Sequence, residues 1–317
     1  MNEKRKYFIE YCKGLAVYDC NALARRVLRK DMFHTKYEKN VYSAVDGNEI
    51  IKNYIRNGTP FAAVRLGGTE IRTIADTIYS QYKLPIFGLN QRTLQRICTL
   101  SGFFPATREN VEGFSKLYLE MLPYVDILCV WDCFMQGYFA NNFAKKASLT
   151  TLYALEPYYF DLPWSSELKG KKVLVIHPFA KTIEKQFRHK EKIFENTEVL
   201  PDMQLMTLKA VQSLGGKSKF ESWFEALEWM YSEAMKMEFD VALIGCGAYG
   251  LPLAIKFKKA GKQAIQIGGA LQLLFGIKGK RWESKPEAAR LFNENWVRPD
   301  VSERPETANS VEGACYW

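Results

Sequence analysis

Two short segments of the chain carry residue types that could bind a phosphorylated substrate. The first is RLGGTE, residues 65–70, in which a basic residue, two glycines and an acid follow an apolar run. A guanidinium binds phosphate oxygens with two parallel hydrogen bonds, and glycines let a ligand approach the backbone. A carboxylate such as that of Glu70 can ligate a divalent cation or face a sugar hydroxyl. The candidate substrate-binding residues here are Arg65, Gly67, Gly68, Thr69 and Glu70, with Glu70 also a candidate catalytic residue and metal ligand. A purely structural alternative is that Thr69 caps a helix whose first turn favours Glu70.

The second segment is GCGAYG, residues 245–250, which matches the pattern G-x-G-x-x-G after an apolar run of strand length. Unpaired amides at the start of a following helix favour an anion, so Gly245, Gly247, Tyr249 and Gly250 are candidate binding residues. A dinucleotide site would need an acid about twenty residues further on. The next expected strand has Gln266 as its only polar side chain, which favours some other phosphate over NAD or FAD. Close packing of helix and strand is the structural alternative.

Further candidates follow other expected strands, because ligands of open α/β sheets bind beyond the carboxyl ends of strands. Asp132, Glu156 and His177 each end an apolar run and could act as a general base. His177 could instead donate a hydrogen bond to phosphate, and all three could be merely structural. Residues that could line the same pocket are Thr182, Lys185, Gly268, Gly269 and Gln272.

Apolar runs that alternate with helical stretches must position these residues. We expect strands at 61–66, 126–131, 151–155, 173–176, 241–244 and 264–267. Strands alternating with helices predict an α/β fold with Rossmann-like parallel sheets flanked by helices. The expected organisation is a helical N-terminal segment (1–57), a first α/β lobe (58–165) and a second Rossmann-like lobe with a packed C-terminal tail (166–317), with a parallel sheet in each lobe.

Composition narrows the class of protein. The sequence has no apolar run long enough to span a membrane and no recognisable signal peptide. Seven scattered cysteines, without a C-x-x-C pair, are typical of reduced thiols in the cytoplasm. The net charge of +9 is dispersed rather than gathered in a stripe, so no nucleic-acid partner is expected. The charge could solvate the surface, attract anionic phosphates or favour peripheral contact with the inner face of a membrane.

The segment RLGGTE resembles the R-F-G-D-G-E segment of bacterial glycosyltransferases of the GT-D fold type. Four later segments, beginning with VLVIHPF, EVLPDMQ, FDVALIGCGAYG and AIQIGGALQLLFGI, resemble relatives of that group from polysaccharide-assembly gene neighbourhoods. The resemblance covers roughly residues 55–317. It implies a nucleotide-sugar donor and transfer of the sugar to a glycan or lipid-linked acceptor. In that fold type a D-x-E motif handles the donor diphosphate through Mn²⁺ or Mg²⁺. This chain keeps the Glu as Glu70 and has Gly68 in place of the Asp, so metal use stays open.

Two other functions remain open from the sequence. An oxidoreductase or methyltransferase could use the same glycine loop. The chain could also be an inactive subunit that binds a nucleotide or a carbohydrate, because one acid of the family motif is absent.

Overall fold

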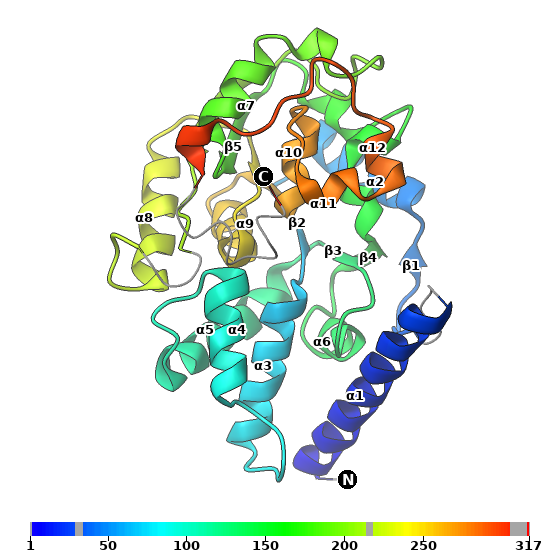
Figure 1. Ribbon diagram of the computed structural model, residues 1–317, viewed down its shortest axis with the longest axis vertical. Coiled ribbons are helices and arrows are strands. Elements are labelled where there is room, and N and C mark those ends of the chain that lie inside the picture. Colours follow the sequence, from blue (N-terminus) through cyan, green and yellow to red (C-terminus); the bar gives the residue numbers. More distant parts are fainter. Residues whose placement is uncertain (1, 29–33, 214–217, 305–315, 317) are drawn as a thin grey trace.

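Eight parallel strands form a single sheet in the order β1-β4-β3-β2-β8-β7-β5-β6 (Figure 1). The computed structural model describes residues 2–28, 34–213, 218–304 and 316. The strands are β1 (Val41–Tyr42), β2 (Ala62–Arg65), β3 (Ile127–Val130), β4 (Ser148–Thr151), β5 (Lys172–His177), β6 (Gln204–Lys209), β7 (Val241–Ile244) and β8 (Gln263–Gln266). The prediction of an α/β fold with parallel strands is therefore confirmed.

The strands of the two expected lobes occupy the two halves of this one sheet. β2 and β8 pair at the centre, where Ala62 lies opposite Ala264. The expectation of a parallel sheet in each lobe is thus corrected to one continuous sheet. The physical reason is that β2 and β8 are almost fully buried, so neither could serve as an exposed sheet edge.

Local differences from the expected elements affect the candidate site. The run 151–155 is not a strand: β4 ends at Thr151, and Leu152–Leu155 forms a 3₁₀ turn. Two further strands, β1 and β6, had not been predicted. β1 has only two residues, and β6 mixes polar with apolar residues and remains half-exposed at an edge of the sheet.

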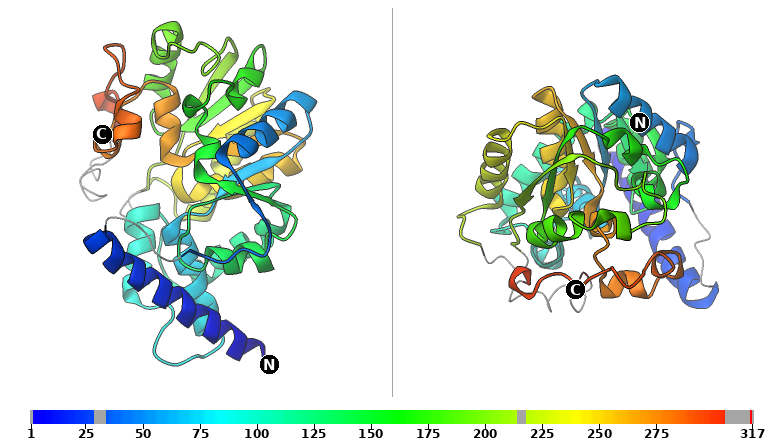
Figure 2. Two further views of the ribbon diagram at one scale, coloured as in Figure 1. Left: turned by 90° about the vertical axis from the view of Figure 1, so that its right-hand side faces the viewer. Right: turned by 90° about the horizontal axis from the view of Figure 1, so that it is seen from above.

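Helices cover both faces of the sheet (Figures 1 and 2). The helices are α1 (Glu3–Leu28), α2 (Ala44–Asn57), α3 (Gly68–Gln81), α4 (Gln91–Ser101), α5 (Arg108–Met121), α6 (Gln136–Asn142), α7 (Ala180–Phe187), α8 (Trp223–Met235), α9 (Gly250–Lys259), α10 (Leu271–Leu274), α11 (Lys280–Glu283) and α12 (Pro286–Ala289). Successive strand residues point to opposite faces. Ala62 and Val64 therefore belong to the core under α3, α5, α8 and α9, whereas Ala63 belongs to the core under α2, α7 and α10.

Helix α1 lies against α3 at one end of the molecule (Figure 1). Its buried Tyr7 donates a hydrogen bond to the carbonyl of Ala75 at 2.8 Å, and Tyr11 donates one to Asp76 at 2.5 Å. The long helix is thereby fixed beside the carboxyl ends of the strands. In the part of the chain that the structure describes, we find no helix with the length and apolar character needed to cross a membrane.

Candidate active site

A cavity of about 1100 Å³ lies at the carboxyl ends of the strands. Its inner wall is built by the segments that follow β2, β3, β5, β7 and β8, and its outer wall by α1 and α6. Most of the sequence-predicted residues line it: Arg65, Gly67, Gly68, Thr69, Glu70, Asp132, His177, Gly245, Gly247, Tyr249, Gly268, Gly269 and Gln272. Segments as distant in sequence as 65–70 and 268–272 thus meet in one place.

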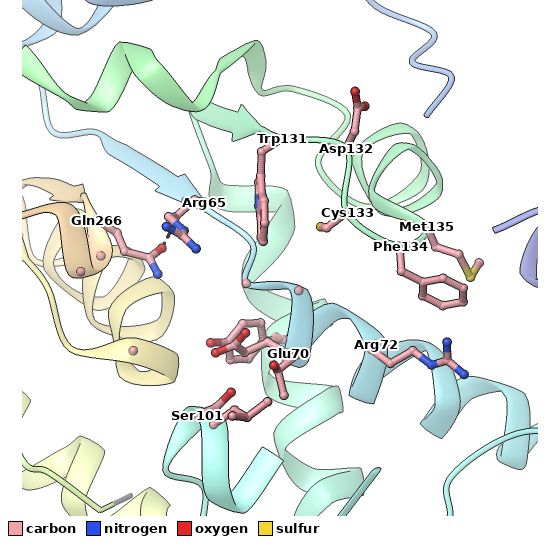
Figure 3. A pocket seen from close by; sticks show the side chains of 18 of the residues that line it. Arg65, Glu70, Arg72, Ser101, Trp131, Asp132, Cys133, Phe134, Met135 and Gln266 are labelled. Atoms are coloured by element: carbon pink, nitrogen blue, oxygen red, sulfur yellow. Dashed lines mark hydrogen bonds between the residues drawn. The ribbon is translucent and has the colours of Figure 1, made fainter. Parts of the chain in front are cut away.

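Arg65 is the last residue of β2 and places a positive charge on the inner wall (Figure 3). Its guanidinium carbon lies 5.3 Å from the ring centroid of Trp131. Its backbone N–H donates to Oε1 of Gln266, at the end of the neighbouring β8, at 3.3 Å. Gly268 has φ = 77°, and a Cβ there would lie 3.3 Å from Nη1 of Arg65. Within the described ranges, no carboxylate forms an ion pair with Arg65, so its charge is available to an anionic ligand.

Glu70 lies in the first turn of α3, with only 8% of its surface exposed. The N-cap of α3 is Gly67, and no side chain caps the helix, so the structural alternative in which Thr69 is the cap is wrong, although Glu70 does lie in the first turn. The helix starts two residues earlier than a Thr69 cap would require, which puts Thr69 inside it. Among the described residues, Glu70 forms no hydrogen bond or ion pair with its carboxylate. A buried carboxylate without a partner is costly, so this one is suited to meet a ligand in the cavity.

His177 ends β5 and is almost fully buried. Its Nδ1 accepts a hydrogen bond from the backbone N–H of Phe179 at 3.0 Å. Burial lowers its pKa from 6.5 to about 3, so the ring is neutral near pH 7. Because Nδ1 is the acceptor, Nε2 carries the proton and can only donate. Of the two roles open from the sequence, the geometry therefore favours that of a donor to phosphate.

The loop from Trp131 to Met135 is held in an unusual backbone conformation. Asp132 and Met135 have φ values of 55° and 54°, a region that side chains rarely adopt and that tends to mark functional sites. The indole N–H of Trp131 donates to the carbonyl of Leu66 at 2.9 Å, while 42% of the residue remains exposed. The ring is thus fixed in place although much of the residue is exposed. Sequence reasoning missed Trp131, although its position as an aromatic residue directly after a buried strand could have indicated it.

Asp132 is joined to a segment far away in the sequence. Its Oδ2 lies 2.8 Å from Nδ1 of His34. Its Oδ1 accepts from the backbone N–H of Thr35 at 3.3 Å and from the hydroxyl of Tyr37 at 3.4 Å. Sequence reasoning missed His34, because nothing near a lone histidine in the sequence indicates a partner 98 residues away.

The structure places four of the candidates away from the cavity lining: Glu156, Thr182, Lys185 and Gly250. Glu303 accepts hydrogen bonds from the backbone N–H and the hydroxyl of Thr182 at 3.1 and 2.5 Å, and Lys185 pairs with Asp300 at 2.8 Å. The C-terminal segment therefore occupies the start of α7, where phosphate contacts were expected.

Glu156 and Gly250 have other surroundings. Glu156 follows the 3₁₀ turn rather than a strand end, and its burial raises its pKa to about 7. A Cβ on Gly250 would lie 2.7 Å from Cγ of Gln266, so this glycine serves close packing.

Two of the cavity-lining candidates already have partners within the protein. The hydroxyl of Tyr249 lies 2.8 Å from that of Ser213, and its ring stacks on Trp223 at a centroid distance of 4.9 Å. Nε2 of Gln272 donates to the carbonyls of Ile277 and Tyr316 at 3.1 and 3.4 Å. We therefore expect both to shape the wall more than to bind a ligand.

The residues present do not form a metal site on their own. Among the residues that the structure describes, no group of three or more His, Cys, Asp or Glu side chains could hold an ion. Glu70 lacks a neighbouring acid at position 68, which is glycine, and Asp132 is already bonded to His34. A hard cation requires several oxygen ligands, so the donor set does not fit Mn²⁺ or Mg²⁺.

Two solved structures are similar to this chain. One is described as the highly conserved domain of unknown function 1792 with a distinct glycosyltransferase fold. It shares 14% identity with this chain, covers 73% of this chain and 78% of its own, and gives a TM-score of 0.42. The other is a selenomethionine-substituted structure of the same domain, with 14% identity, 84% and 93% coverage and a TM-score of 0.45. No family model matches the chain, and no curated protein matches it. At this level of similarity, the activity has to be argued from the cavity.

Proposed function

We propose that this protein is a glycosyltransferase of the GT-D type that moves a sugar from a nucleotide-sugar donor to a glycan or lipid-linked acceptor. The observation that carries the proposal is that one cavity contains a guanidinium and a buried carboxylate, on Arg65 and Glu70, that form no side-chain hydrogen bond or ion pair among the described residues. A nucleotide sugar offers the matching groups, because its diphosphate is anionic and its sugar carries hydroxyls.

The donor diphosphate would lie between Arg65 and His177. Arg65 supplies a positive charge and paired donors, and Nε2–H of His177 supplies a neutral donor. The uncapped amides at the start of α3 add the partial positive charge of a helix N-terminus. Glycosyl transfer needs the leaving nucleoside diphosphate to be stabilised as negative charge develops on it. Preorganised hydrogen-bond donors of this kind would stabilise the leaving group without a metal ion.

Glu70 would accept hydrogen bonds from hydroxyls of the donor sugar. The carboxylate is already desolvated, so hydrogen bonds to a ligand replace interactions that it lacks in the free protein. The cavity volume of about 1100 Å³ lies just above the range of about 300–1,000 Å³ common for ligand sites. It therefore has room for an acceptor beside the donor.

The acceptor and the cellular setting follow from the same proposal. Transfer to a glycan or lipid-linked acceptor would take place in the cytoplasm, with the basic surface favouring peripheral contact with the inner face of the membrane. Synthesis of a bacterial polysaccharide or glycoconjugate is the process that this resemblance implies. We expect no nucleic-acid partner, since the charge is dispersed.

A thermal-shift screen of UDP-, GDP-, CMP- and dTDP-sugars, beside NAD, FAD and S-adenosylmethionine, tests the proposal. A ligand at about one hundred times its dissociation constant stabilises the folded state by about 2.7 kcal/mol. We expect a shift with one nucleotide sugar that falls at least tenfold in apparent affinity for Arg65→Gln. Arg56→Gln is the matched control, because Arg56 forms a surface ion pair with Glu167 outside the cavity lining.

Three outcomes separate the candidate functions. A shift only with NAD, FAD or S-adenosylmethionine would contradict the proposal and favour an oxidoreductase or methyltransferase. Binding of a nucleotide sugar without transfer to any glycan or lipid-linked acceptor would favour an inactive binding subunit. Binding with transfer supports a glycosyltransferase.

A further inference from the structure

Two histidines line the same cavity in opposite hydrogen-bonding states. Nδ1 of His177 accepts from a backbone N–H, which leaves Nε2 as a donor. Nδ1 of His34 faces a carboxylate oxygen of Asp132 at 2.8 Å. Because a carboxylate oxygen accepts the hydrogen bond, Nδ1 of His34 is the donor, which leaves Nε2 as the nitrogen that can take up a proton.

Asp132 is arranged to hold His34. Its second oxygen accepts from Thr35 and Tyr37, which belong to the same segment as His34. Tyr37 also donates to Gln136 at 3.2 Å, and Gln136 accepts from the backbone N–H of Trp131 at 3.0 Å. Several hydrogen bonds thus join the segment 34–37 to Asp132 in the strained loop after β3 and to Gln136 at the start of α6. A base held by an oriented carboxylate is the arrangement used to activate hydroxyl groups.

Arg65, Trp131 and Asp132 follow one another along the cavity wall (Figure 3). Trp131 also borders the start of α3, because a Cβ on Gly68 would lie 3.5 Å from its Cη2. If the diphosphate lies at Arg65, the next group along the wall is the donor sugar, against the exposed face of Trp131. The group beyond the sugar is the acceptor, beside His34 and Asp132.

We propose that His34 is the general base of the transfer and that Asp132 is its positioning residue, an inference that rests on the proposed glycosyltransferase function. As the bond between the acceptor oxygen and the anomeric carbon forms, the hydroxyl proton moves to Nε2 of His34. The bond between that carbon and the diphosphate breaks, and its electron pair leaves with the nucleoside diphosphate. The attack comes from the side opposite the leaving group, so the configuration at the anomeric carbon inverts.

The outer part of the cavity fits an acceptor that has both apolar and polar groups. Its wall presents Val17 and Tyr18 of α1 and Phe134 and Met135 of the loop, together with nearby polar and charged side chains. Both α1 and the loop are fixed at their contact: a Cβ on Gly14 would lie 2.7 Å from Cγ of Met135. We expect the acceptor to bind against this wall, which places its hydroxyl beside His34.

The test compares His34→Gln, His34→Ala and Asp132→Asn with the wild type, measuring donor affinity and the kcat of transfer separately. Loss of a general base lowers rates by about 10²–10⁴. We expect that loss in kcat for His34→Gln, with donor affinity within twofold of the wild type. Imidazole added to the buffer should restore part of the activity of His34→Ala. Asn tolerates the left-handed backbone of position 132, so Asp132→Asn should fold and lower kcat by at least tenfold.

A double variant and a matched control complete the test. The losses from His34→Ala and Asp132→Asn should not add, because the carboxylate acts only through the imidazole. His189→Gln, at an exposed histidine outside the cavity lining, should transfer at the wild-type rate.

Transfer by His34→Gln within threefold of the wild type, or His34→Ala activity that imidazole does not restore, would overturn the assignment while leaving the glycosyltransferase proposal intact. Absence of nucleotide-sugar binding by the wild type would instead overturn the proposed function and this inference with it. Retention of configuration in the product would also refute the in-line attack.

Discussion

The carboxylate of Glu70 occupies the space that a side chain on Gly67 would need. A Cβ at position 67 would lie 1.8 Å from Oε2 of Glu70. The backbone of Gly67 has φ = −71° and ψ = 144°, which any residue can adopt. The glycine is therefore required by the position of the carboxylate rather than by the backbone. The buried carboxylate of Glu70 therefore lies against the N-terminus of α3, and glycine at position 67 leaves room for it.

Gly67→Ala is expected to displace Glu70 and weaken donor binding at least tenfold, with little change in the unfolding midpoint. Isothermal titration with the nucleotide sugar measures the affinity. In a Glu70→Ala background, the same substitution should have almost no effect, because its target is already absent. Equal losses in both backgrounds would show that Gly67 acts on the ligand directly.

His177 should make the protein less stable as the solution becomes acidic. Its pKa in the folded state is about 3, below the 6.5 of the unfolded chain. Below pH 6.5 His177 binds a proton in the unfolded state but stays neutral in the folded state, so the free energy of unfolding falls as the pH falls. Between pH 7 and pH 5 this group alone costs about 2 kcal/mol.

Urea unfolding of His177→Gln across this pH range should give a shallower loss of stability than the wild type. The matched control is His189→Gln, at an exposed histidine, which should keep the wild-type slope. Parallel slopes for His177→Gln and the wild type would contradict the buried neutral state of His177.

Sequence reasoning located the inner wall of the cavity because parallel strands bring their carboxyl ends to one edge. Residues at or just beyond the carboxyl end of a strand, such as Arg65, His177 and Gly268, could therefore be placed without knowing the packing. The glycine pattern and the apolar runs were sufficient for that step. The function of these residues stays a prediction.

Sequence reasoning failed where a side chain takes a partner from a distant segment. Thr182 and Lys185 looked free for phosphate, but Glu303 and Asp300, more than 100 residues later, bond to them. His34 is positioned by Asp132 across 98 residues. Such pairs depend on how segments that are not adjacent in the sheet come together, and no local pattern encodes that.

Glu156 should reduce stability at neutral and alkaline pH. Desolvation raises its pKa from 4.5 to about 7, partly opposed by Tyr158, Lys285 and Arg65. An acid with a raised pKa destabilises the folded state as the pH rises from 4.5 through 7, because the unfolded state releases the proton more readily. Glu156→Gln should therefore exceed the wild type in unfolding free energy by about 3 kcal/mol at pH 8.

The gain from Glu156→Gln should shrink as the pH falls and vanish only below pH 4.5, where the carboxyl is largely protonated in both states. Denaturant unfolding at pH 5 and pH 8 measures the difference. Glu120→Gln on the exposed face of α5 is the control, with the same chemical change and no burial. A gain that is independent of pH would point to repacking and away from the ionisation of Glu156.

Gly68→Asp should create a metal site with two acids beside the proposed donor site. A Cβ at position 68 would lie 3.5 Å from Trp131, which is ordinary van der Waals contact, so the side chain has room. The second carboxylate would lie two residues from Glu70, giving the D-x-E spacing of the glycosyltransferases that RLGGTE resembles. Two acids together with a donor diphosphate can supply the oxygen ligands that Mn²⁺ needs.

We expect Mn²⁺ to tighten nucleotide-sugar binding by Gly68→Asp at least tenfold, and EDTA to reverse the effect. Gly68→Asn has the same shape without the charge and should show no response to Mn²⁺. The wild type should bind the donor with the same affinity in Mn²⁺ and in EDTA, because in the proposed site Arg65 and His177 take the place of the cation. A loss of wild-type donor binding in EDTA would mean that Glu70 alone recruits the ion through the diphosphate, and the metal-independent site would be refuted.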